Sequence, residues 1–203
     1  MVSSLENIPR LNLVRLGKVL SYTTLKEIGE RIIDSFDGII RDIDLSHFET
    51  PVTESIDAYF LTRILDTEFG GHTLGITDAD LKTKDEDAFY NTIIGGKNPE
   101  NDVAVVSIRR LSPERIETQS DYELLVQRTL KVSLHEMGHN LGLTDHADYY
   151  FGAKGALCPM SKGETNKLGH RAYIRAVVDG RGADFCDECN YFLKTVYGNK
   201  IKR

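Results

Sequence analysis

The feature that most restricts this chain is the string HEMGH at residues 135–139, which lies in a long segment of helical character. Ser120 and Glu123 have the spacing of a capping box, and Gly142 is a typical end signal, so we expect a helix over 120–141. Two histidines four residues apart lie on the same face of a helix, ~6 Å apart along its axis. The sequence therefore predicts a helix that presents two imidazoles to one metal ion.

The chemistry of this string points to a catalytic zinc. Imidazole nitrogens bind zinc at about 2.0–2.1 Å, and a catalytic site needs a third protein ligand and an open position. We take His146 as that third ligand beside His135 and His139, because Gly142 can adopt the left-handed conformation that turns the chain back beneath the metal. Glu136 then takes the proton of a metal-activated water as general base, and hydrolysis is the reaction class.

Other interpretations of these residues stay open. Two histidines and a glutamate can share a helix face by chance, with no metal. A downstream carboxylate such as Glu164 can serve as the third ligand, although Gly142 and His146 then have no role. The alternative function is a zinc-stabilised interaction domain without turnover, against which Glu136 argues because it is not a ligand.

The cysteines indicate a second metal site. Only Cys158, Cys186 and Cys189 occur, an odd number in the last quarter of the chain, which is unlike a secreted disulfide framework. The last two form a Cys-x-x-Cys pair, which favours metal over redox chemistry because it does not open a helix within a βαβ unit. Met160 follows Cys158 closely, where a tight turn would place a thioether under the first metal, although methionine is also a common core filler.

These motifs together resemble a known family. The string HEMGHNLGLTDH, interpreted as H-E-x-x-H-x-x-G-x-x-H ending at His146, resembles the metzincin clan of zinc peptidases when Met160 is added. Cys158-Pro159-Met160 and the later Cys-x-x-Cys pair are similar to the archaemetzincins in particular. This resemblance implies a mixed sheet, an active-site helix and two zinc ions.

The resemblance also implies a ligand set for the second zinc. In archaemetzincins a cysteine directly after the third histidine completes a four-cysteine site, and we place Ala147 at that position here. We therefore expect Cys158, Cys186 and Cys189 to hold a chiefly structural zinc with a fourth ligand that is not cysteine. His170 is our first choice for that ligand, ahead of Asp148 or water.

The remaining sequence alternates strand and helix patterns. We expect strands at 11–20, 39–45, 72–76, 88–94 and 103–108, and helices at 21–35, 54–69, 120–141 and 167–178. The expected fold class is α/β, or α+β in a stricter scheme: a metzincin-like zincin fold with a twisted mixed sheet, an active-site helix and a small irregular C-terminal lobe. We expect a single metallopeptidase domain over 1–203, with an N-terminal lobe at 1–142 and a C-terminal lobe at 143–203. A bound peptide is expected along the edge strand at 88–94.

Composition limits the partners. A formal charge of −6 without a basic run argues against nucleic acid. No window approaches the ~20 apolar residues that span a bilayer, and we see no signal peptide, so we expect a cytoplasmic protein without a membrane partner. The expected partner is a peptide substrate, and the sequence does not indicate an oligomeric state.

Overall fold

A computed structural model describes residues 9–17, 20–50, 54–83, 92–146, 149–152, 154–162 and 169–201. Its main sheet has five strands in the order β2-β1-β4-β8-β7, of which only the edge strand β7 runs antiparallel to its neighbour. A small second sheet has the order β3-β5-β6. The strands are β1 (Leu11–Leu16), β2 (Ile43–Phe48), β3 (Ser55–Asp57), β4 (Thr73–Thr77), β5 (Asp80–Lys82), β6 (Thr92–Ile93), β7 (Gly95–Lys97) and β8 (Val103–Ser107).

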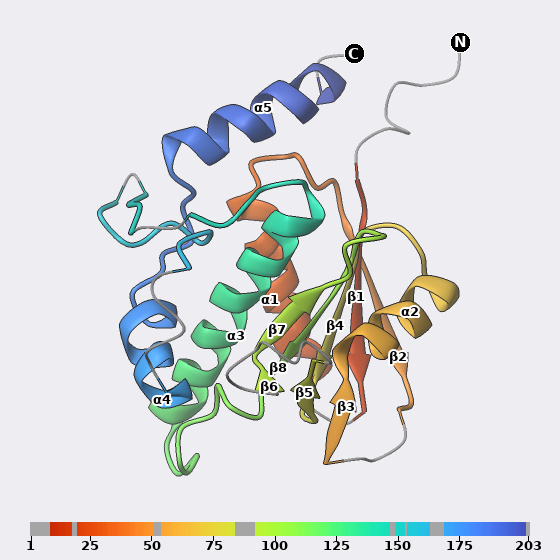
Figure 1. Cartoon of the computed structure of the whole chain (residues 1–203), viewed down its shortest axis with the longest axis vertical. Coiled ribbons are helices and arrows are strands. Elements are labelled where there is room, and N and C mark those ends of the chain that lie inside the picture. The colour runs from red at the N-terminus through yellow and green to blue at the C-terminus, as the bar shows by residue number, and fades with distance from the viewer. Residues whose placement is uncertain are drawn as a thin grey trace.

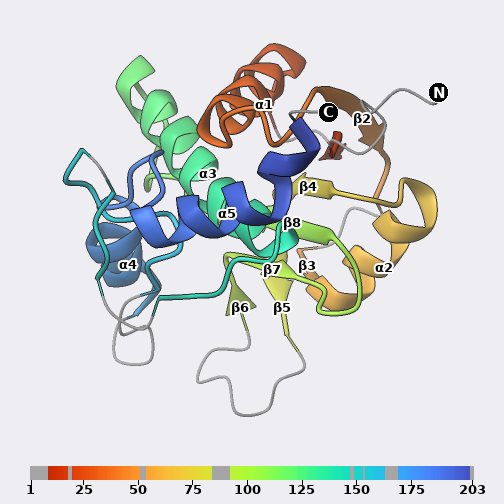
Figure 2. The same ribbon diagram turned by 90° about the horizontal axis from the view of Figure 1, so that it is seen from above.

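Helices cover both faces of the main sheet (Figures 1 and 2). They are α1 (Tyr22–Ser35), α2 (Ala58–Glu68), α3 (Gln119–Asn140), α4 (His170–Tyr173) with its π-helical continuation η3 (Ile174–Val178), and α5 (Asp187–Ile201). Alternate residues of the interior strand β8 enter different cores: Ala104 and Val106 pack with the α1 and α3 side, whereas Val103 and Val105 pack with the α2 side. This alternation explains why β8 is buried at every position.

Helix α3 is the element that carries the histidine pair. Its N-cap is Thr118, whose hydroxyl accepts from the backbone N–H of Asp121 at 3.1 Å, while the Asp121 carboxylate accepts from the Thr118 N–H at 2.9 Å. The capping box thus lies two residues before the expected one at Ser120. The helix ends in a Schellman motif at Gly142, which has φ 89° and is followed by a 2.9 Å hydrogen bond from the Leu143 N–H to the Gly138 carbonyl.

Most of the predicted elements are confirmed, including the α/β class with a mixed sheet. The predicted edge strand at 88–94 lies largely outside the described residues. The edge strand next to β8 is β7, which lies in a segment that we did not expect to be a strand. Helix α5 was not expected, because exposed Tyr191 and Phe192 interrupt the apolar stripe formed by Cys189 and Leu193. The division into lobes at residue 142 stays a prediction. No helix of the described residues could cross a membrane.

Candidate metal centre

His135 and His139 point the same ring nitrogen at one another. The Nδ1 atom of His135 donates to the Pro159 carbonyl at 2.9 Å, and that of His139 donates to the Leu143 carbonyl at 2.9 Å. Because a carbonyl only accepts, both Nδ1 atoms carry the ring proton, and both Nε2 atoms present lone pairs. These Nε2 atoms are 3.3 Å apart, so two lone pairs converge without a proton between them.

Asp145 completes this group. Its Oδ1 atom is 3.4 Å from the His135 Nε2 and 3.3 Å from the His139 Nε2. This oxygen is buried and has no hydrogen-bond partner. Two imidazole lone pairs and a carboxylate oxygen, all within 4.8 Å of one another, are a donor set that fits a divalent cation such as zinc.

The expectation that His146 joins the first metal is corrected by the structure. Counted from His135, the pattern H-E-x-x-H-x-x-G-x-x-H ends ten residues later, at Asp145 and not at His146. The His146 backbone is paired on both sides, donating to the Met160 carbonyl at 2.9 Å and accepting from the Lys162 N–H at 3.2 Å. Consecutive side chains of an extended chain point to opposite sides, so Asp145 faces the two histidines and His146 faces away from them.

His146 lies instead among the three cysteines. Its Nε2 atom is 3.2 Å from the Cys189 Sγ and 3.3 Å from the Cys186 Sγ, and the Sγ atoms of Cys158 and Cys189 are 3.9 Å apart. The four ligand atoms all lie within 4.8 Å of one another, and the cysteines are free thiols. Three thiols and one imidazole form a donor set that suits structural zinc.

This arrangement replaces our choice of fourth ligand. His170 begins α4, where the charges that act on it are those of Arg110 and Asp80, and it does not join the cysteines. Ala147 and Asp148, the other positions considered, lie outside the described residues. The ring of Tyr150 stacks on His146 with centroids 4.3 Å apart, which fixes the plane of the imidazole.

The thiol of Cys158 is the most acidic of the three. Its hydrogen bond with the Cys189 thiol, 3.9 Å between the two Sγ atoms, and a 3.4 Å hydrogen bond from the Cys186 N–H lower its pKa to about 5. Zinc binds the thiolate form of cysteine, so the cluster is prepared for metal even without one.

Glu136 lies beside the first group and is almost fully buried, with 6% of its surface exposed. Burial raises its pKa to about 7, the range that suits a general base near neutral pH. The carboxylate packs directly against Gly95 of the edge strand, where an added Cβ would stand 2.6 Å from Oε1. The absence of a side chain at Gly95 therefore gives Glu136 its space.

Met160 lies under helix α3, in a tight turn of the kind that the sequence predicted. Its thioether packs so closely against Gly138, between the two histidines, that a Cβ at Gly138 would overlap the Sδ atom. A tight turn places it there, closed by a 2.9 Å hydrogen bond from the Ser161 N–H to the Cys158 carbonyl. The same turn presents the Pro159 carbonyl to His135.

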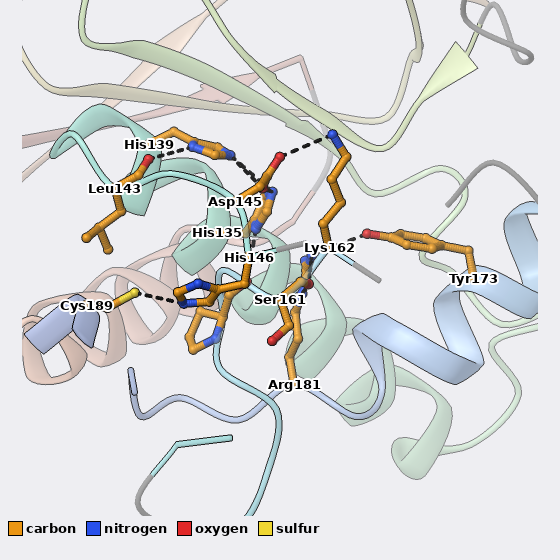
Figure 3. A network of polar contacts seen from close by, with 11 residues as sticks. His135, His139, Leu143, Asp145, His146, Ser161, Lys162, Tyr173, Arg181 and Cys189 are labelled. Carbon is orange, nitrogen blue, oxygen red and sulfur yellow. Dashed lines mark hydrogen bonds and ion pairs between the residues drawn. The ribbon is translucent and has the colours of Figure 1, made fainter. Parts of the chain in front are cut away.

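Three polar residues beside the first group were not predicted from the sequence: Lys162, Arg181 and Tyr173 (Figure 3). The Lys162 Nζ atom is 3.2 Å from the Asp145 Oδ2. Buried Arg181 donates twice to the Ser161 carbonyl, at 2.8 and 3.1 Å, and once to the Tyr173 hydroxyl, at 3.2 Å. No spacing rule identifies these residues, because they reach the site from loops and from α4.

Part of the chain is similar in sequence to curated archaemetzincins. No family model matches the chain. It is 43% identical over 72 residues to an archaemetzincin of Thermococcus kodakarensis, covering 36% of this chain and 37% of that one, and 39% identical over 70 residues to an archaemetzincin of Pyrococcus furiosus, covering 34% of each. The chain thus spans about a third of the length of the curated relatives that it matches.

Solved structures match almost the whole chain. The archaemetzincin of Methanopyrus kandleri superposes with a TM-score of 0.68 at 22% identity, over 96% of both chains. The chain has the archaemetzincin fold. A zinc-dependent peptidase from Methanocorpusculum labreanum matches with a TM-score of 0.60 at 19% identity, over 90% of this chain and 99% of that one.

Two adjacent residues set this chain apart from the archaemetzincin pattern. Asp145 stands where the pattern has its third histidine, and His146 stands where it has the following cysteine, a position we had assigned to Ala147. Asp145 and His146 each place a donor atom in one of the two groups, and each group could hold a metal ion.

Proposed function

We propose that this protein is a zinc-dependent peptidase whose catalytic zinc is held by His135, His139 and Asp145. The observation that carries the proposal is the convergence of two proton-free Nε2 atoms and the orphaned Oδ1 of Asp145. The similarity to archaemetzincins and to a zinc-dependent peptidase supports peptide hydrolysis as the activity. Asp145 takes the place that the sequence interpretation gave to His146.

In this proposal Glu136 is the general base. A zinc ion bound there supplies Lewis acidity, which polarises a carbonyl and makes a water molecule acidic near neutral pH. Glu136, with a pKa of about 7, accepts the proton of that water and passes it to the leaving nitrogen. Hydrogen bonds to Pro159 and Leu143 hold the two imidazoles in the tautomer that leaves Nε2 free.

We place the peptide along β7 instead of the segment 88–94. This strand ends the main sheet, so an extended peptide can pair with its outer edge through backbone hydrogen bonds. Gly95 of β7 touches Glu136, which brings the peptide backbone close to the base. The proposed partner is therefore an extended peptide segment.

We further propose that Cys158, Cys186 and Cys189 bind a second, structural zinc with His146 as the fourth ligand. The support is the four buried donor atoms within 4.8 Å of one another. Their free thiols are also in accord with the cytoplasmic location that we propose, since reducing compartments keep thiols from pairing.

A peptide library tests the activity. Zinc-loaded protein incubated with peptides of varied sequence, and analysed by mass spectrometry, should release fragments that a chelator abolishes and added zinc restores. Fully metal-loaded protein that cleaves no peptide of the library would contradict the proposal and favour a zinc-stabilised domain without turnover.

A further inference from the structure

The proposed catalytic group differs in charge from one with three imidazoles. Neutral imidazoles add no charge to the ion, whereas the Asp145 carboxylate adds a negative one. An anionic ligand reduces the positive charge that polarises a carbonyl or acidifies a water. Without compensation, a site with Asp145 is a weaker Lewis acid than a site with three histidines.

A cation stands at the oxygen of Asp145 that faces away from the histidines. The Lys162 Nζ atom is 3.2 Å from Oδ2, whereas Oδ1 is the oxygen near the two Nε2 atoms and has no hydrogen-bond partner. The two oxygens are therefore divided between the ammonium and the proposed metal. Figure 3 shows Asp145 between the imidazoles on one side and Lys162 on the other.

The backbone of Lys162 is fixed although its ammonium is half exposed. Its N–H donates to the His146 carbonyl at 3.2 Å, directly beside Asp145 in the chain. The carbonyl of the preceding residue, Ser161, accepts two hydrogen bonds from buried Arg181. The backbone of Lys162 is therefore held opposite Asp145. An ordinary surface ion pair, whose partners are not held in this way, contributes little to stability.

We propose that Lys162 is a positioning residue that compensates the charge of Asp145 and holds it as a one-oxygen ligand. This inference rests on the proposed function of the same site. The ammonium draws negative charge towards Oδ2 and leaves Oδ1 to the metal, as outer partners of ligating carboxylates do. The metal, Asp145 and Lys162 together then carry the same net charge as a metal held by three histidines.

Two substitutions separate charge from packing. Lys162→Gln keeps a hydrogen-bond donor but removes the charge, and Lys162→Arg keeps the charge. Cobalt replaces zinc as the probe, because thiolate charge-transfer bands mark the cysteine group. The d–d absorption that rises without a rise in those bands reports the other site. Lys154→Gln is the control, since Lys154 forms an exposed ion pair with Asp184 elsewhere.

Charge compensation predicts that only the variant without the charge differs from the parent. Lys162→Gln should bind cobalt at the non-thiolate site roughly three- to tenfold more tightly, because a nearby positive charge is gone. Lys162→Arg and Lys154→Gln should behave like the parent.

The inference is overturned if Lys162→Gln leaves the cobalt affinity unchanged or weakens it, or if Lys162→Arg changes the affinity as much as Lys162→Gln does. Because cobalt affinity is measured without substrate, this result does not depend on hydrolysis. A parent that binds cobalt but cleaves nothing would contradict the proposed function alone.

Discussion

Asp145 and His146 are consecutive residues that point into different metal groups. The Asp145 Oδ1 is 3.3 Å from the His139 Nε2, whereas the His146 Nε2 is 3.2 Å from the Cys189 Sγ. A second pair of consecutive residues also connects the two groups. Cys158 belongs to the cysteine group, and the carbonyl of the next residue, Pro159, accepts a hydrogen bond from the His135 Nδ1. The two groups therefore share two short backbone segments.

This double link predicts that the groups bind metal cooperatively. Cys186→Ser with Cys189→Ser should remove the second metal and free the segments at 145–146 and 158–159. Metal at the first group should then bind more weakly, by roughly tenfold or more. Equilibrium dialysis measures this, and an unchanged affinity of the first group in the double variant would show that the groups are independent.

Glu136→Gln should keep both metals and the fold but lower kcat by at least ~10²-fold, because general-base steps typically contribute 10²–10⁴. Glutamine has nearly the same shape and cannot accept the proton of a water. Metal analysis and circular dichroism provide the controls. Hydrolysis at the parental rate would exclude Glu136 as the base.

Gly95→Ala should lower kcat because the new methyl group meets Glu136 at 2.6 Å from Oε1 and displaces the carboxylate. We expect a loss of about tenfold or more, with little change in metal content. Gly169→Ala is the matched control, since an added Cβ there meets no atom within 4 Å. Equal kinetics of the two variants would indicate that Glu136 tolerates the displacement.

The contribution of the Asp121 cap to the stability of helix α3 should depend on pH. Hydrogen bonds from the Thr118 hydroxyl and N–H and from the Glu117 N–H lower its pKa, so its stabilising effect is present above its unfolded pKa of about 3.9 and is lost as the pH falls through the folded value. Asp121→Asn should therefore melt lower than the parent at pH 7, and the difference should shrink as the pH falls below the unfolded pKa of about 3.9. Glu123→Gln removes a charge on the same helix without affecting the cap, so an equal loss in both variants would refute the capping role.

The sequence was sufficient to predict helix α3 and the common face of its two histidines. The spacing of His135 and His139 fixes their common face, and Gly142 fixes the end of the helix, because these features depend on neighbours in the chain. The third ligand was placed one residue too far along the chain, at His146 instead of Asp145. In an extended segment a shift of one residue moves a side chain to the opposite side of the backbone. Lys162 was out of reach, since its contact depends on a turn and a loop far from the helix in sequence.

The division of ligands between Asp145 and His146 is the central claim, and cobalt titration of two variants tests it most directly. Asp145→Ala should lose the non-thiolate site and keep the thiolate charge-transfer bands of the parent. His146→Ala should alter those bands, because the cysteine group loses its fourth ligand. The account is contradicted if Asp145→Ala binds both ions like the parent while His146→Ala loses the non-thiolate site and keeps its thiolate bands unchanged.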